Sequence, residues 1–295
     1  MPEPSLCPVL VDERVLVFLG WEGKRTFFLA AKNIENDAIT WRWERPSTHT
    51  IWRLDVSRSG EFIGVILGEE LGEYTPPDAD DEHPRTQIGL IGPDRRSIDW
   101  VTILVGANSV ENSRVEQVLP SDDGTYVAVA GYGNQVAIVD VAARKPLWVK
   151  KPVTESSLVC AAFSPDARLV YSGGTAGVVF AFDVRNGEIV GQWFASRSGT
   201  EEYGHQITCI SASGDGRWVA VGTGPEGDVY VGDARRHKLV ATLPHGGSTI
   251  LMVQFSPDSA ALASFGAGKL KIWRAADWDA QPQPATQPAS QSSPR

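Results

Sequence analysis

Short apolar runs recur along the chain, and turns rich in Ser, Asp, Gly and Pro divide them. The stretch "AAFSPDARLVYSGG" at 161–174 is one example. The stretch "QFSPDSAALASFGAG" at 254–268 repeats its order of apolar run, Ser-Pro-Asp turn and second apolar run. Runs of β-branched and aromatic residues bounded by such turns are typical of strands. The pattern predicts a chain built from short strands joined by tight turns.

The residue that closes each Ser-x-Asp-like turn marks the repeat. The markers are Gly60, Gly124, Ala167, Gly216 and Ser259, at separations of 64, 43, 49 and 43 residues. In every unit, one β-rich run precedes the turn and two follow it. A third run follows the turn in all units but the last. Four strands per unit at this period are typical of the blades of a β-propeller.

A lone four-stranded blade cannot bury both of its faces, so neighbouring blades must stack around an axis. We therefore expect an all-β fold, a single β-propeller over residues 1–279 with clear repeats at 50–275. Six blades fit best, and seven are the alternative. Residues 8–49 are expected to form a partial blade around Gly23 and an N-terminal strand that closes the last blade. The Pro/Gln/Ser-rich residues 280–295 are expected to be disordered.

Dipeptides at fixed places in the repeat resemble those of the WD-repeat β-propellers. Gly204-His205 stands where that family has its Gly-His pair, and His245-Gly246 reverses it. The family's Trp-Asp position holds Val139-Asp140, Phe182-Asp183, Gly232-Asp233 and Trp273-Arg274. The resemblance covers about three quarters of the chain, and it implies that His205 hydrogen-bonds within its own blade. It implies a fold and leaves the function open, because the family is defined by architecture.

Two tryptophans follow the repeat at a second regular spacing. Trp148 comes eight positions after Asp140, and Trp100 comes eight positions after Gly92. This resembles the tryptophan-docking repeat of the quinoprotein-like propellers, which implies that these indoles pack between adjacent blades. We expect no quinone or other cofactor, because the enzymes of that class have more blades and are exported.

The charge and cysteine content narrow the classes of partner and compartment. The formal net charge of −9 argues against nucleic acid and an anionic membrane surface as partners. Cys7, Cys160 and Cys209 are odd in number and lack motif spacing, which favours a reducing compartment. The first residues resemble no secretory signal, and no apolar run reaches the roughly 20 residues of a membrane helix. We expect a cytoplasmic protein.

Basic residues follow the third strand of several units and raise the question of a phosphate-binding ring. They are Arg95, Arg96, Arg144, Lys145, Arg185, Arg235, Arg236 and Lys238. In an up-and-down blade, these basic residues and the Ser-x-Asp turns emerge on the same side. We therefore expect the aspartates of those turns to neutralise the basic clusters, and no nucleic-acid binding to result.

Motifs that would carry catalysis are missing from the sequence. The stretch "GTGPEG" at 222–227 matches the glycine fingerprint of dinucleotide sites, but a strand follows it instead of a helix. No nucleophile elbow, phosphate loop or histidine pair at metal-binding spacing occurs. We predict no catalytic residue, metal or cofactor.

The long step between the first two markers contains an acidic insertion, "GEELGEYTPPDADDEHPR" at 68–85. Long loops on rigid scaffolds often carry function, so we interpret it as a contact for a protein with a basic surface. The candidate residues are Glu69, Glu70, Glu73, Tyr74, Asp78, Asp80, Asp81 and Glu82. The alternative interpretation is a solvated loop without a partner.

Three functional hypotheses remain. The first is a non-catalytic scaffold that mediates protein–protein interactions within a multi-protein complex. The second is an enzyme of hydrolase or lyase type at the mouth of the central channel, with His205, Glu201 and Glu226 as candidates. The third is a sensor that binds a small ligand or a peptide in that channel.

Overall fold

The computed structural model describes ten stretches of the chain. They are 9–12, 15–22, 26–46, 49–69, 85–94, 97–104, 115–131, 135–151, 157–196 and 205–279. These stretches are mostly β-strands, and the one helix among them, α1 (Ala275–Asp279), follows the last strand. The predicted all-β class is therefore confirmed.

The strands form antiparallel units in the order of the sequence. The first unit consists of β1 (Val9–Asp12), β2 (Val15–Glu22), β3 (Thr26–Asn33) and β4 (Ile39–Pro46). The second consists of β5 (His49–Val56), β6 (Ile63–Glu69), β7 (Arg85–Ile91) and β8 (Ile98–Leu104). The third consists of β9 (Val115–Pro120), β10 (Tyr126–Gly131), β11 (Gln135–Asp140) and β12 (Lys145–Lys150).

The remaining units repeat this meander. The fourth consists of β13 (Leu158–Phe163), β14 (Leu169–Gly174), β15 (Val178–Asp183) and β16 (Ile189–Phe194). The fifth consists of β17 (Gln206–Ala212), β18 (Trp218–Gly224), β19 (Asp228–Asp233) and β20 (Lys238–Pro244). The sixth has three described strands, β21 (Ile250–Phe255), β22 (Ala261–Gly266) and β23 (Lys269–Arg274). The third and fourth units join in one sheet through the pair Gly131 and Leu158.

The turn between the first two strands is built alike in the second to sixth units. In the fourth unit, the hydroxyl of Ser164 accepts a hydrogen bond from the amide of Leu169 (2.9 Å) and donates one to Asp166 (2.7 Å). The marker Ala167 then has a positive φ of 51°, and the other four markers have φ values of 61° to 77°. Glycine reaches this left-handed conformation without steric cost, which explains why it holds three of the five positions.

Successive units pack face to face, and a hydrophobic cluster fills each of the five junctions between them. Alternate residues of one strand point to opposite faces of a sheet, so an inner unit must be apolar on both. In the fourth unit, Val170 and Phe182 pack against the third unit, whereas Tyr171 and Ala181 pack against the fifth. This is why the strands of that unit are almost continuous apolar runs.

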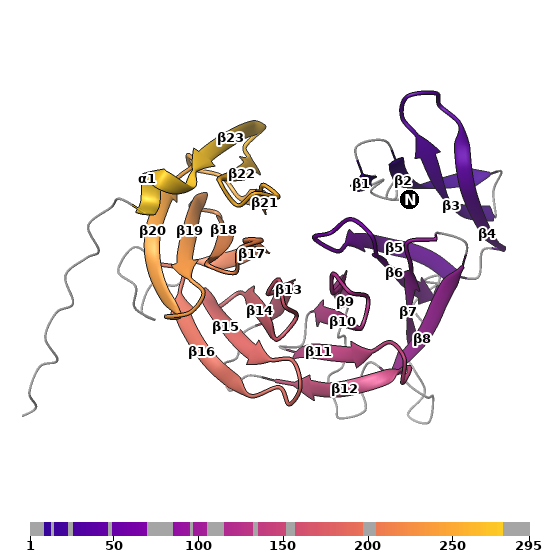
Figure 1. Ribbon diagram of the computed structural model, residues 1–295, viewed down its shortest axis with the longest axis horizontal. Helices are drawn as coiled ribbons and strands as arrows, with labels where there is room; N and C mark the ends of the chain where they lie inside the picture. The colour runs from indigo at the N-terminus through magenta and orange to yellow at the C-terminus, as the bar shows by residue number, and fades with distance from the viewer. Residues whose placement is uncertain are drawn as a thin grey trace, which may run out of the picture.

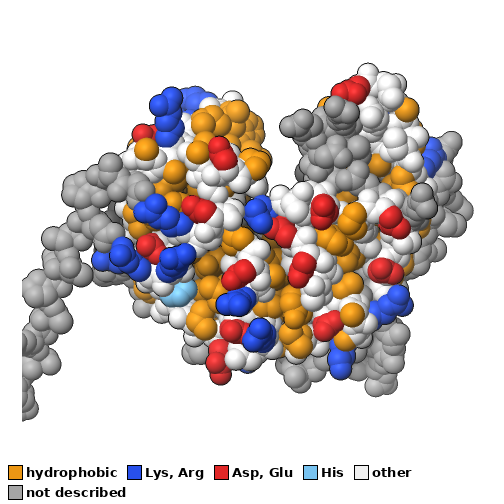
Figure 2. All heavy atoms as spheres, in the orientation of Figure 1, with side chains coloured by type: hydrophobic (Ala, Val, Ile, Leu, Met, Phe, Trp, Pro, Cys, Tyr) orange, Lys and Arg blue, Asp and Glu red, His pale blue; other side chains and the backbone are white. Residues whose placement is uncertain are grey.

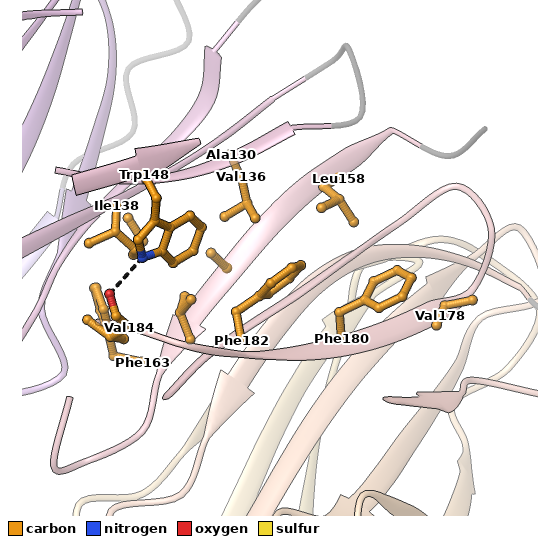
Figure 3. Packing of buried hydrophobic residues seen from close by; sticks show 13 residues of the cluster. Ala130, Val136, Ile138, Trp148, Leu158, Phe163, Val178, Phe180, Phe182 and Val184 are labelled. Atoms are coloured by element: carbon orange, nitrogen blue, oxygen red, sulfur yellow. Dashed lines mark hydrogen bonds between the residues drawn. The ribbon is translucent and has the colours of Figure 1, made fainter. Parts of the chain in front are cut away.

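Trp148 confirms the predicted docking between units. Its indole Nε1 donates a 2.7 Å hydrogen bond to the carbonyl of Val184 in the fourth unit, and its ring lies 6.0 Å from that of Phe182 (Figure 3). Trp100 also packs between units, but toward the preceding one, where its ring lies 5.6 Å from that of Trp43. The two predicted tryptophans therefore dock in opposite directions along the chain.

Figure 1 shows the six units arranged as an arc around a common centre, with a gap between β21–β23 and the first unit. The partial blade predicted around Gly23 contains β2 and β3, one before and one after this glycine, and β4 follows them. β1 pairs with β2, so the described strands do not include one that completes the sixth unit. The blade number and the closure by an N-terminal strand stay predictions.

Candidate interaction surfaces

The acidic insertion lies almost wholly outside the described residues. Glu69 is the last residue of β6, and the other seven predicted contact residues fall within 70–84. The structure places the insertion between β6 and β7 of the second unit. Its role as a partner contact stays a prediction.

Two of the three candidate enzyme residues meet in the fifth unit. Nδ1 of His205, just before β17, lies 3.1 Å from Oε2 of Glu226 in the turn between β18 and β19. The imidazole also stacks on the ring of Tyr230, with centroids 6.0 Å apart. Glu201 lies outside the described residues. The contact stays within one unit, as the WD-repeat resemblance implied for His205.

Among the described residues, no three His, Cys, Asp or Glu side chains lie close enough together to hold a metal ion. His245 is buried, and its Nε2 lies 3.2 Å from the carbonyl of Ser264. Burial lowers the pKa of His237, and nearby Asp233 partly opposes this.

A charged pair occupies the centre on the side of the Ser-x-Asp turns. Arg58, between β5 and β6, forms an ion pair with Asp122 of the third unit, and the amide of Ser59 donates a 2.7 Å hydrogen bond to the same carboxylate. A Cβ placed on Gly214 of the fifth unit would lie 3.0 Å from Arg58 Nη1. The second and fifth units are not neighbours in chain order, so Arg58 reaches across the centre of the arc.

Two of the basic residues after the third strands form ion pairs with carboxylates other than the predicted ones. Arg144 pairs with Asp99 (3.5 Å), and Arg236 pairs with Asp233 (3.8 Å). Four aspartates of the turns are instead hydrogen-bonded to the serines of their own turns: Asp123, Asp166, Asp215 and Asp258. Neutralisation occurs for these two arginines, but through residues at or beside the ends of neighbouring strands.

An apolar surface that we call the end face lies on the sixth unit. It consists of Leu251, Met252, Phe265, Leu270 and Ile272, whose exposed fractions run from 37% to 64%. Met252 pairs with Phe265, and Phe265 pairs with Leu270, so one apolar row crosses all three strands. In Figure 2 hydrophobic side chains gather over β21–β23 beside a hollow in the molecule. Large exposed apolar patches are often found at interaction sites.

The end face results from the same two-sided pattern that fills the junctions. Val253, Phe255 and Leu262 on the opposite side of the sheet are buried against the fifth unit. Among the described residues, no hydrophobic cluster joins the end face to the first unit. The alternation in "ALASFG" and "KLKIW" indicates a two-sided sheet, and the predicted closed ring would bury both of its sides.

The described helix is too short to cross a membrane. Residues 125–290, more than half of the chain, match the family model described as "Nucleolar protein 10-like, N-terminal domain", a β-propeller. The WD repeat domain-containing protein 83 of Danio rerio is 26% identical over 125 residues, which are 42% of this chain and 38% of that protein.

A second relative is the dihydro-heme d1 dehydrogenase of Pseudomonas aeruginosa. It is 37% identical over 82 residues, which are 28% of this chain and 15% of that protein. Each match therefore covers less than half of the relative's own length. Together with the family model, these similarities confirm the predicted WD-repeat and quinoprotein-like β-propeller superfamily.

Proposed function

Because the chain belongs to the nucleolar protein 10-like β-propeller family, we propose that it is a non-catalytic scaffold that mediates protein–protein interactions in a multi-protein complex. The end face is the observation that carries this proposal. Burying a large aliphatic or aromatic side chain stabilises a protein by about 1.5–3 kcal/mol. Five such side chains on one sheet leave this gain available to a partner.

The acidic insertion is the second proposed contact, for a partner with a basic surface. Its seven carboxylates would attract that partner through interactions that salt screens, whereas contacts at the end face would tolerate salt. The two surfaces lie in the second and the sixth unit, so one scaffold could bind two partners.

Affinity purification of the full chain from its native host tests the scaffold role. A stoichiometric partner is expected at low salt. Changing the acidic residues of 69–82 to Ser should release the salt-sensitive partner, and Val149→Asp, on an exposed position of β12, serves as a control that should release none. A chain that is recovered alone under all conditions would contradict the proposal.

A second candidate function rests on the contact between His205 and Glu226. A hydrolase or lyase could use this imidazole as a general base with the carboxylate orienting it. The pair would need a substrate-binding surface beside it. Loss of a measured activity in His205→Gln, with the fold retained, would favour this alternative over the scaffold, and a ligand carried through purification would favour a small-molecule or peptide sensor.

The cytoplasm is the proposed compartment of the complex. The family description names a nucleolar protein, so the nucleolus is the alternative compartment. Imaging of the tagged full-length chain in its host distinguishes the two.

A further inference from the structure

The end face has the composition of a buried junction, although it lies at the end of the arc. In the fourth unit, Tyr171 of β14 and Phe182 of β15 are buried on opposite faces of the sheet, because another unit packs against each face. The sixth unit has the same two-sided pattern, but within the described stretches a hydrophobic cluster covers its face toward the fifth unit alone. Leu270 and Ile272, on the other face, are 62% and 63% exposed.

We propose that a β-sheet element of a protein partner packs on the end face as an additional blade, a proposal that rests on the scaffold function. Continuity with the five existing junctions supports a sheet as the occupant, because each of them consists of one antiparallel unit packed on the next. Figure 2 shows a hollow in the molecule beside β21–β23.

The charges beside the end face specify the partner further. Lys269 and Arg274 are exposed at the two ends of β23. Lys271 lies on the opposite side of the sheet, where its Nζ is 3.0 Å from the carbonyl of Pro244 in the fifth unit. No acidic residue occurs in β21, β22 or β23. The partner sheet should therefore be apolar on the side that packs on the end face and acidic at its margin.

The same charges disfavour two other occupants. A second copy would bring its own β23, with Lys269 and Arg274, against this one, and like charges would face each other. The first unit presents Lys32 and Arg42 on the face away from the second unit, and the guanidinium of Arg42 lies 4.1 Å from the ring centre of Phe28. Among the described residues, these two basic side chains lie on that face, and Lys32 forms an ion pair with Asp37.

Photo-crosslinking of the full chain in its native host tests the proposal. The photoreactive residue p-benzoylphenylalanine replaces Leu270, and replaces Val149 in a matched control at a similarly exposed position of β12. We expect a crosslink from position 270 to a strand of one partner, and none to that partner from position 149. Reconstitution with the purified partner should then slow amide exchange in that strand and in β23.

Affinity measurements with the purified partner give a second readout. Leu270→Asp should weaken binding by about 30-fold, as for a residue at the centre of an interface, while Val149→Asp leaves it unchanged. Because Leu270 is exposed, the variant should fold, and an unchanged circular dichroism spectrum and melting temperature verify this.

Other results would overturn the proposal in distinguishable ways. A crosslink to residues 9–46 of the same chain shows that the ring closes on itself, and a crosslink between isotopically different copies shows a dimer. A crosslink to a helical segment rejects the sheet. A partner that remains bound to Leu270→Asp at full affinity rejects the end face but leaves the scaffold function standing, whereas the absence of any partner rejects both.

Discussion

The indole Nε1 of Trp148 in β12 donates a 2.7 Å hydrogen bond to the main-chain carbonyl of Val184, beyond the end of β15. The two residues belong to different units, and Trp148 is itself largely buried. A Cβ on Gly187 would lie 2.8 Å from the same indole, so this glycine lets the ring approach the backbone. One side chain therefore fixes the distance and the orientation of two successive sheets.

Removing the Trp148 hydrogen bond should destabilise the fold measurably. Trp148→Phe keeps most of the ring but removes the donor, and we expect a loss of about 1 kcal/mol in the free energy of unfolding. Trp148→Ala should cost about 3–5 kcal/mol through the cavity that it leaves. Urea denaturation measures both, with the exposed neighbour Leu147→Ala as the control, expected within about 0.5 kcal/mol of wild type. A Trp148→Phe variant as stable as the control would refute the role of the bond.

Alanine substitutions at two marker glycines distinguish the cost of backbone strain from the cost of a steric clash. Both have a φ of 68°, where an alanine costs roughly 1–2 kcal/mol. A Cβ on Gly216 would meet only Pro165, at 3.7 Å, whereas a Cβ on Gly124 would lie 2.3 Å from the ring of Phe62. Gly124→Ala should therefore destabilise the protein more than Gly216→Ala in the same urea titration. Equal losses would show that the Phe62 ring moves aside without cost.

The serine–aspartate turns should make stability depend on acid pH. Slight desolvation acts to raise the pKa of Asp166, but hydrogen bonds from Ser164 and from the Arg168 amide outweigh it and hold the pKa below its ordinary value of 3.8. A lowered carboxyl pKa contributes stability above the ordinary value, and this contribution is lost as the pH falls through the folded-state pKa. Stability should therefore decline below about pH 4.

The Ser164→Ala variant tests this assignment, because its decline should be shallower than that of wild type. Urea midpoints measured from pH 6 to pH 3 give the comparison. Ser172→Ala is the matched control, since the Ser172 hydroxyl bonds to the carbonyl of Cys160 and touches no titratable group through that bond. It should lower stability without changing the pH dependence. Identical acid profiles for wild type and Ser164→Ala would contradict the prediction.

The two described cysteines should resist alkylation in the folded protein. Burial raises the pKa of the Cys209 thiol to about 11, and burial together with nearby Cys209 raises that of Cys160 still further. At pH 8, only about one thousandth of the Cys209 side chains, with a pKa of about 11, are present as the reactive thiolate. Mass spectrometry after iodoacetamide treatment should find both unmodified until denaturant is added. Rapid modification of Cys209 in the native protein would indicate an open junction between the fifth and sixth units.

Sequence alone determined the local structure of the repeat. The Ser-x-Asp turns were readable because their hydrogen bonds connect residues two and five positions apart, as between Ser164, Asp166 and Leu169. The left-handed conformation at Gly124 and Gly216 follows from the same few residues. Docking of Trp148 between units was also predictable, because the repeat fixes which strand it lies on. The direction was not predictable, since Trp100 at the same spacing packs toward the preceding unit.

Only the tertiary structure decided which contacts join the units and which face has none. Arg58 and Asp122 are 64 positions apart, and His205 and Glu226 are 21 apart; no local pattern pairs either. The strands around Phe265 and Leu270 have the same alternation as strands buried on both sides. Whether an apolar face is covered depends on the neighbouring sheet, and among the described residues the sixth unit has a neighbouring sheet on one side only.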